Sequence, residues 1–163
     1  MSLQTVVRPL GEGDLSWVLQ LNQIHQQDLS SLTSDQLAAL ASAATIAWVA
    51  APDLGFMLAF DQDAPYDGVN FQWFRSRYDQ FIYVDRIAVD EKARGRGVAR
   101  QLYSDLFVHA GEAGYSLIAA EINSDPPNPG SDAFHERLGF ETVGETDLAD
   151  RGKTVRYVAR QLD

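Results

Sequence analysis

The apolar positions in the first part of the chain change from strand-like to helical spacing. Residues Thr5–Arg8 form a short β-rich run that ends at Pro9. From Asp14 onward apolar residues recur every three to four positions, so we expect Asp14 to cap a first helix. Thr33 followed by Gln36 is a capping-box pattern, which predicts the start of a second helix. A strand and two helices are therefore expected first.

The next segment combines two β-rich runs with an irregular stretch. Residues 45–51 and 54–60 surround Pro52-Asp53, which predicts a hairpin. Residues 61–80 break the alternation, and we interpret them as a long loop with one helical turn. This stretch holds a group of aromatic side chains, namely Tyr66, Phe71, Trp73, Phe74 and Tyr78.

Strands and helices alternate in the second half. We expect strands at 81–89, 115–122, 140–146 and 154–162, a helix from Gly97 to Gly111, and a short helix that Ser131 or Asp132 caps and that reaches Leu138. This order predicts an α/β (α+β) fold, with a mixed, mostly antiparallel central sheet and helices on both faces. A length of 163 residues suits a single domain, which we place at residues 1–163.

Composition narrows the classes of partner. The net charge of −10 disfavours nucleic acid and would attract a cationic substrate, although an acidic surface that only aids solubility is the alternative. No apolar run approaches the ~18 residues that span a membrane, and no signal segment is visible, so we expect a cytoplasmic protein. Without cysteine there are no disulfides or thiolate ligands, and His25, His109 and His135 lack metal-ligand spacing. We expect no metal.

The most informative stretch is Arg94-Gly95-Arg96-Gly97-Val98-Ala99, between a predicted strand and a predicted helix. Two glycines allow a tight turn that brings backbone N–H groups close to a ligand. The following helix directs its positive end to the same place, and Arg94, Arg96 and Arg100 add charge suited to a pyrophosphate. The alternative is a glycine-rich turn with solvated arginines.

Other phosphate-binding loops fit this stretch less well. The P-loop pattern Gly-x-x-x-x-Gly-Lys-Ser/Thr does not occur in the chain. A dinucleotide-binding loop needs a third glycine where this chain has Arg100, and it belongs early in a Rossmann unit. A small dinucleotide-binding module therefore remains only a third hypothesis.

The loop resembles the (Gln/Arg)-x-x-Gly-x-(Gly/Ala) signature of the GNAT N-acetyltransferase superfamily. Three more features match in order: the strand before the loop, the strand at 116–123, and Phe134-His135-Glu136-Arg137-Leu138-Gly139-Phe140, which is similar to the family's Phe-Tyr-x-x-Leu-Gly-Phe element. Together they cover about residues 81–145. The resemblance implies an acetyl-CoA-dependent transferase that acetylates a primary amine of a small molecule or peptide by direct attack.

The resemblance also implies where coenzyme A binds. The loop would hold the pyrophosphate, the backbone of Val89 would bond the pantetheine arm, and the N–H of Ile87 would stabilise the oxyanion. Polar groups on the following strand and loop would touch the pantetheine or the amine, with a plain turn as the alternative. The implied cofactor-binding residues are Ile87, Ala88, Val89, Arg94, Gly95, Arg96, Gly97, Val98, Ala99, Arg100, Asn123, Asn128, Ser131 and Phe134.

Proton transfer needs a base and an acid. Asp85 is our first candidate base and Glu121 the second; strand alternation groups Asp85 with Tyr83 and Ile87. The alternative for Asp85 is a buried ion pair with an arginine. The family commonly has a tyrosine as acid where this chain has His135, and Tyr103 or Tyr115 are other sources of a hydroxyl.

Acceptor specificity is expected from the first two helices and from residues 61–80. Candidate pocket residues, for each of which core packing is the alternative, are Asn22, His25, Trp48, Trp73, Phe74 and Tyr78. Because His135 departs from the family pattern, a catalytically weak acyl-CoA-binding sensor is the rival function. A homodimer is expected only by analogy with the family.

Overall fold

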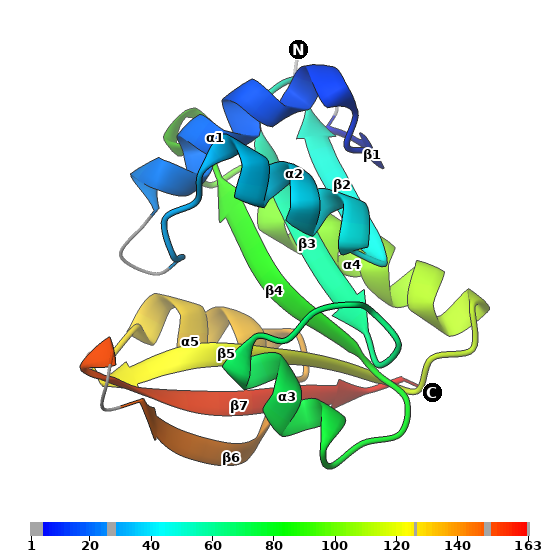
Figure 1. Ribbon diagram of the computed structural model, residues 1–163, viewed down its shortest axis with the longest axis vertical. Helices are drawn as coiled ribbons and strands as arrows, with labels where there is room; N and C mark the ends of the chain where they lie inside the picture. The colour runs from blue at the N-terminus through cyan, green and yellow to red at the C-terminus, as the bar shows by residue number, and fades with distance from the viewer. Residues whose placement is uncertain (1–4, 26–28, 126, 149–150, 163) are drawn as a thin grey trace.

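The strands form one mixed sheet. The computed structural model describes residues 5–25, 29–125, 127–148 and 151–162. Within these residues seven strands occur in the spatial order β1-β2-β3-β4-β5-β7-β6, and all neighbours are antiparallel except β4 and β5 (Figure 1). The strands are β1 (Val6–Pro9), β2 (Ile46–Ala51), β3 (Gly55–Asp61), β4 (Ile82–Val89), β5 (Leu117–Asp125), β6 (Glu141–Leu148) and β7 (Lys153–Gln161).

Helices cover both faces of this sheet. Two 3₁₀ turns, Glu12–Asp14 and Glu91–Ala93, precede α1 and α4. Figure 1 shows α1 and α2 on the viewer's side of β2–β4, α3 on the same side of β5 and β7, and α4 and α5 behind the sheet. The α-helices are α1 (Leu15–Ile24), α2 (Ser34–Ala43), α3 (Val69–Arg75), α4 (Val98–Glu112) and α5 (Pro129–Arg137). The predicted fold class is confirmed.

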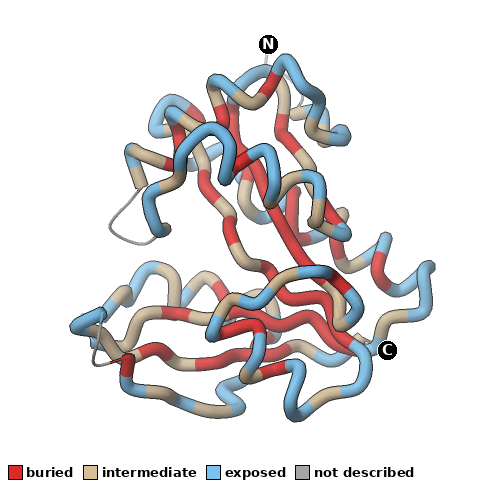
Figure 2. The backbone as a smooth tube through the Cα atoms, viewed as in Figure 1, coloured by how far each residue is buried: buried red, intermediate tan, exposed pale blue. Residues whose placement is uncertain are grey.

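The core follows the central strands. Buried residues run along β3, β4, β5 and β7, whereas the outward helix faces and β6 are exposed (Figure 2). One apolar cluster joins the sheet to α4 and includes Met57, Leu102 and Ile118. On the opposite face Phe56 packs with α1 and α2, and Phe74 of α3 packs with β4 and β7. This two-sided burial fixes the positions of the central strands.

The sheet opens between β4 and β5. These parallel neighbours pair only at Ile82↔Ile118 and Tyr83↔Ala119, near the start of each strand. Beyond these pairs the two strands diverge, as Figure 1 shows. One edge of β4 and one edge of β5 are therefore without strand partners along most of their length.

A β-bulge at Asp85 corrects the predicted alternation. In the β3–β4 register Leu58 faces Arg86 and Ala59 faces Val84, so Asp85 is the extra residue. Tyr83 consequently packs in the α3-side cluster, whereas Ile87 packs on the α4 side. The expectation that Tyr83, Asp85 and Ile87 share one face is wrong, because one inserted residue reverses the side-chain order beyond it.

The residues that cap the helices agree only in part with those predicted from the sequence. The Thr33 hydroxyl accepts from the Gln36 N–H at 3.1 Å, so the capping box of α2 is confirmed. Asp14 precedes α1, but its carboxylate accepts hydrogen bonds from Arg8 and Trp17 and from the N–H of Gly11 rather than capping α1. For α5 the predicted caps Ser131 and Asp132 are wrong. Asn128 caps it, and Pro129 occupies the first turn, where a missing N–H costs nothing.

The stretch 61–80 contains more helix than expected. It holds α3, a seven-residue helix of about two turns, instead of a single turn in a loop. The aromatic side chains drive this, because Phe71 and Phe74 are fully buried against the sheet. In the described residues no helix combines the length and apolar character needed to cross a membrane.

Candidate functional site

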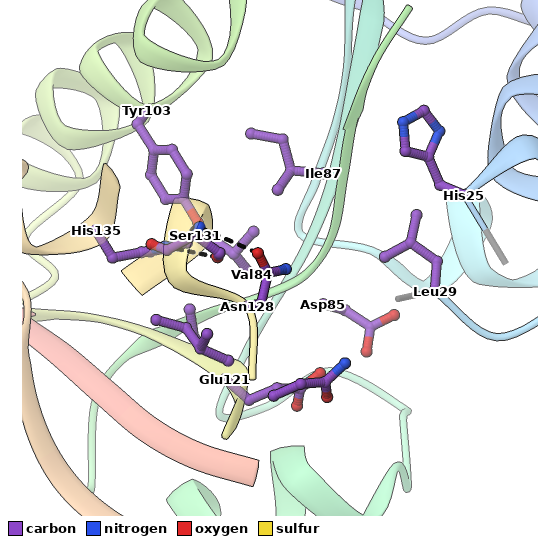
Figure 3. A pocket seen from close by; sticks show the side chains of 13 residues that line it. His25, Leu29, Val84, Asp85, Ile87, Tyr103, Glu121, Asn128, Ser131 and His135 are labelled. Atoms are coloured by element: carbon purple, nitrogen blue, oxygen red, sulfur yellow. Dashed lines mark hydrogen bonds between the residues drawn. The ribbon is translucent and has the colours of Figure 1, made fainter. Parts of the chain in front are cut away.

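Two adjoining cavities lie where β4 and β5 separate. Leu29, Asp85 and Glu121 line both of them and form their shared wall. The first, here called the α5 cavity, is also lined by His25, Val84, Ile87, Tyr103, Ala120, Ile122, Asn123, Asn128, Ser131 and His135 (Figure 3). The second, the α3 cavity, is also lined by Ser30, Tyr66, Gly68, Val69, Asn70, Tyr83, Arg86, Arg151 and Lys153.

Along the open edge of β4, backbone N–H and C=O groups point toward the gap between β4 and β5. The N–H of Asp90 donates to the carbonyl oxygen of Leu54 at 2.8 Å, which makes these residues a hydrogen-bonded pair. Hydrogen-bonded pairs alternate with non-bonded pairs along an antiparallel ladder, so the backbone N–H and C=O groups of Ala88 also bond to β3. The corresponding groups of Ile87 and Val89 point away from β3. These groups face the gap where β5 has diverged.

The glycine-rich loop leads into α4 beside this edge. Gly95 and Gly97 have φ values of 78° and 76°, a region that favours glycine. Gly97 is the N-cap of the 15-residue helix α4, and no side chain caps this helix among the described residues. The first N–H groups of a helix have no partner within it, so those of Val98 and Ala99 are available to an anion. Arg94, Arg96 and Arg100 are exposed around the loop.

Asp85 lies in a dense polar cluster. Its carboxylate accepts from the Tyr66 hydroxyl at 2.8 Å and pairs with the Arg86 Nε at 3.2 Å, with both charged side chains below 10% exposed (8% and 9%). Arg86 also donates to the Asn22 Oδ1 and the Ser30 carbonyl oxygen. Burial raises the pKa of Asp85, and Arg86 opposes that rise. The buried Asp85–arginine pair considered from the sequence is present.

Glu121 has fewer partners than Asp85. Its carboxylate accepts one hydrogen bond, from the Tyr83 hydroxyl at 2.8 Å. Burial, and then the nearby charge of Asp85, raise the pKa of Glu121 to about 7. Figure 3 shows the carboxylates of Asp85 and Glu121 on the same side of the pocket, apart from Tyr103 and His135. A carboxylate that titrates near neutrality and borders a cavity is suited to accept a proton.

His135 is held between a carbonyl group and a tyrosine. Its Nδ1 lies 2.8 Å from the Ser131 carbonyl oxygen, which can only accept, so Nδ1 carries a proton. Its Nε2 lies 2.9 Å from the Tyr103 hydroxyl oxygen and accepts a hydrogen bond from that hydroxyl group. Burial lowers the pKa of His135, which favours this neutral form. The imidazole thus orients the Tyr103 O–H instead of presenting a proton of its own.

The predicted cofactor-binding residues come from both sides of the gap. Ile87, Asn123, Asn128 and Ser131 line the α5 cavity, as do all three predicted catalytic residues. Phe134 packs on the Tyr103 ring, with centroids 5.8 Å apart, and does not line either cavity. The side chain of Ala88 lies on the opposite sheet face, in the cluster with α1 and α2.

Among the predicted acceptor residues only His25 lines one of the two cavities. Trp48 packs edge-on against His109 on the α4 side, and Trp73 stacks on Tyr157 at 4.3 Å. Asn22 is buried and supports Arg86. Phe74 and Tyr78 belong to the cluster beneath α3. Core packing, the alternative reading, describes these side chains better.

Several cavity residues were not expected from the sequence. They are Leu29, Asn70, Tyr83, Arg151 and Lys153. Tyr66 appears in the aromatic group of residues 61–80, and Tyr103 was considered as a hydroxyl source. Tyr115, the other candidate hydroxyl, donates to Asp61 at 2.6 Å and lines neither cavity. A group of acidic residues and histidines able to hold a metal ion is absent from the described residues.

Asp85→Asn is expected to lower the free energy of unfolding by about 3 kcal/mol, because it leaves the buried Arg86 charge without its carboxylate partner. Urea denaturation measures this, with the exposed Asp79→Asn as the matched control. A stability change no larger than that of the control would show that the ion pair is not structural.

The family was identified by comparison with known proteins. The model of the acetyltransferase (GNAT) family matches residues 19–140, most of the chain. The chain belongs to the GNAT family. A GNAT relative, the uncharacterized N-acetyltransferase YhbS of Escherichia coli K12, is 31% identical over 109 residues. That alignment covers 66% of this chain and 56% of YhbS, so the chain spans about half the length of this curated relative.

Solved structures show the same GNAT fold. Ard1 from Thermoplasma volcanium matches with a TM-score of 0.78 at 15% identity, covering 99% of both chains. The structure of yncA from Salmonella typhimurium, solved with acetyl-CoA, matches with a TM-score of 0.70 at 18% identity, over 99% of this chain and 95% of that chain. At these identities the likeness concerns the fold alone.

Proposed function

We propose that this protein transfers an acetyl group from acetyl-CoA to a primary amine. One arrangement supports this above the others: β4 leads through the glycine-rich loop to the start of α4, which no side chain caps, and the unpaired edge of β4 and the Glu121 carboxylate border the gap between β4 and β5. The anion site and the strand edge can bind the cofactor, and the carboxylate can take the proton that the amine must lose.

The chain fits coenzyme A through its backbone. The N–H groups at the start of α4, from Gly97 to Ala99, would hold the pyrophosphate, and the exposed arginines around them would neutralise it. The free backbone groups of Val89 would bond the pantetheine arm as an added strand would. The N–H of Ile87, which points into the same gap, would stabilise the negative charge that develops on the thioester oxygen.

Glu121 is the proposed base. A lysine-like amine has a pKa of about 10, so it arrives protonated and must lose a proton before it can attack. The raised pKa of Glu121, about 7, brings the carboxylate closer to the pKa of the amine than an ordinary glutamate. Asp85, the first candidate from the sequence, is occupied by Tyr66 and Arg86, and it acts by keeping the pKa of Glu121 high.

Tyr103 is the proposed donor to the departing sulfur, and His135 is its positioning residue. After the amine has given one proton to Glu121, a C–N bond forms and the C–S bond breaks, and the second amine proton leaves with the sulfur as a thiol. The Tyr103 O–H, which donates to His135 Nε2 at 2.9 Å before the reaction, borders the α5 cavity and would turn from the imidazole to donate to the sulfur as negative charge develops there. A tyrosine hydroxyl is thus supplied from α4 although position 135 is histidine.

Tyr103→Phe is expected to lower kcat about 100-fold while changing the KM for acetyl-CoA little, because the hydroxyl acts on the leaving group rather than on binding. Steady-state kinetics measure both constants. The matched control is Tyr115→Phe, which also removes a hydrogen-bonded hydroxyl, but one outside both cavities. Equal kcat values for the two variants would exclude Tyr103 from catalysis.

Turnover with a panel of primary amines tests the function itself. Because the chain contains no cysteine, released coenzyme A can be followed with a thiol reagent without a background from the protein. We expect acetylation of at least one amine with a kcat that rises with pH. Tight binding of coenzyme A without turnover of any amine would instead favour the acyl-CoA sensor, whose main support was the missing tyrosine at position 135.

A further inference from the structure

The α3 cavity carries charges of both signs at opposite ends. Asp85 and Glu121 form the wall that it shares with the α5 cavity, where the amine would react. Arg151 and Lys153 line the same cavity from the start of β7 and the residues just before it. Arg151 is exposed and Lys153 is half-buried, whereas the Asp85 side chain is only 9% exposed and burial raises the pKa of Glu121. The cavity therefore has an anionic floor and a cationic mouth.

The register of β7 directs Lys153 to the side of Glu121. Side chains alternate along a strand, so Lys153 shares a face with Val155 and Tyr157. Both of these residues are buried in the cluster beneath α3, and the Tyr157 hydroxyl donates to the Asn70 Oδ1 at 2.8 Å. Asn70 itself lines the α3 cavity. Alternation and cavity lining thus agree on where Lys153 lies.

The two cations are not used by other ion pairs in the part of the chain that the structure describes. The ion pairs found there join Arg8 with Asp14, Arg86 with Asp85, and Arg156 with Asp132. Lys153 and Arg151 do interact with Glu121 through space, since both oppose the rise of its pKa. A simple cation such as a diamine would be attracted to the floor but repelled at the mouth.

The spacing between the charges limits the size of a ligand. Glu121 pairs with Tyr157, and Lys153 lies four residues before Tyr157, about 13 Å along the strand. Side chains stand roughly perpendicular to a sheet, so the charged ends keep about this separation, and one charged contact of about 3 Å at each end leaves about 7 Å for the ligand. An amine and an anion separated by four or five bonds fit that distance.

We propose that the α3 cavity binds a small amine that also carries a carboxylate or another oxyanion four or five bonds from its reactive nitrogen. The nitrogen lies at Glu121 and the anion lies between Lys153 and Arg151. This assignment rests on the proposed acetyl transfer, and it names the class of acceptor. Opposite charges on one ligand satisfy both ends of the cavity, which a neutral amine or a diamine cannot do.

A matched set of amines tests the assignment. 4-Aminobutyrate, butylamine and 1,4-diaminobutane present the same amine on the same chain with an anionic, an apolar or a cationic far end. We expect kcat/KM for 4-aminobutyrate to exceed that of the other two by at least about tenfold, the size of one charge-assisted contact. Equal or higher values for butylamine would overturn the assignment.

Variants at the cavity mouth separate binding from a general effect on the fold. Lys153→Gln should raise the KM for 4-aminobutyrate about tenfold with a small change in kcat, and Lys153→Glu should shift the preference toward 1,4-diaminobutane. Arg137→Gln removes an equally positive but exposed charge on α5, outside both cavities, and should keep the preference. Retained preference in both Lys153 variants would contradict the assignment.

The outcomes also separate this inference from the proposed function. Acetylation of amines without preference for the zwitterion refutes only the acceptor class. Absence of both coenzyme A binding and acetylation refutes the proposed function. If coenzyme A binds but none of the three amines reacts, calorimetric titration of the coenzyme A-saturated protein with each amine decides. Tighter binding of 4-aminobutyrate than of butylamine and 1,4-diaminobutane supports the assignment. Equal binding of the three amines, or no binding, overturns it.

Discussion

Glu121→Gln is expected to lower kcat about 10²- to 10³-fold and to remove the inflection near pH 7 from its pH profile. In the native protein burial and the charge of Asp85 raise the pKa of Glu121 to about 7, so the fraction of the active carboxylate form increases as the pH rises through 7. The glutamine side chain keeps the size of glutamate but cannot accept the proton. The residual rate should then rise only toward the pKa of the free amine, about 10.

The pH dependence of kcat, measured from pH 5.5 to pH 10 for both proteins, checks this expectation. Glu145→Gln is the control, since Glu145 is an exposed carboxylate on β6 and lines neither cavity. The assignment fails if the variant keeps the inflection near pH 7. A loss of that inflection in Asp85→Asn alone, with the fold intact, would transfer the role to Asp85.

Gly97→Glu is expected to weaken the binding of coenzyme A by at least about 100-fold, equivalent to about 2.7 kcal/mol. The substitution places a negative side chain at the start of α4, where the helix would otherwise attract the pyrophosphate. It also forces a residue with a Cβ atom to adopt a φ of 76°, which costs about 1–2 kcal/mol.

Two further variants separate these effects in isothermal titration calorimetry. Gly97→Ala introduces the backbone strain without the charge, and we expect it to bind coenzyme A better than Gly97→Glu. Gly111→Glu adds the same charge to the same helix at its other end, where no neighbouring atom lies within 4 Å of the added Cβ. Unchanged affinity in Gly97→Glu would remove the loop from the binding site.

Local sequence signals predicted most elements of this fold because each depends on neighbours in the chain. The capping box at Thr33 and Gln36 and the β-rich run that forms β4 are examples. The bulge at Asp85 could not be predicted from alternation, since it depends on how β4 aligns with β3. The second turn of α3 escaped prediction for a similar reason: Phe71 and Phe74 become helical by packing on the sheet.

In the candidate site, too, features set by neighbouring residues were predictable and features set by distant residues were not. The loop that caps α4 was predictable because Gly95 and Gly97 are required by their positive φ values. The partnership of Tyr103 with His135 joins residues 32 positions apart, and no local pattern indicates it. Lys153 and Arg151 face Glu121 only because β7 inserts beside β5 ahead of β6, a topology that the order of strands in the sequence does not reveal.

Backbone amide chemical shifts during a titration with acetyl-CoA test the account most directly, because they report on each N–H group that it assigns to the ligand. The account predicts saturable shifts for Ile87 and Val89, whose N–H groups point into the gap, and for Val98 and Ala99 at the start of α4. Small shifts are expected for Ala88, which bonds to β3. A spectrum that does not change, or changes only away from these residues, would contradict acetyl transfer at this site.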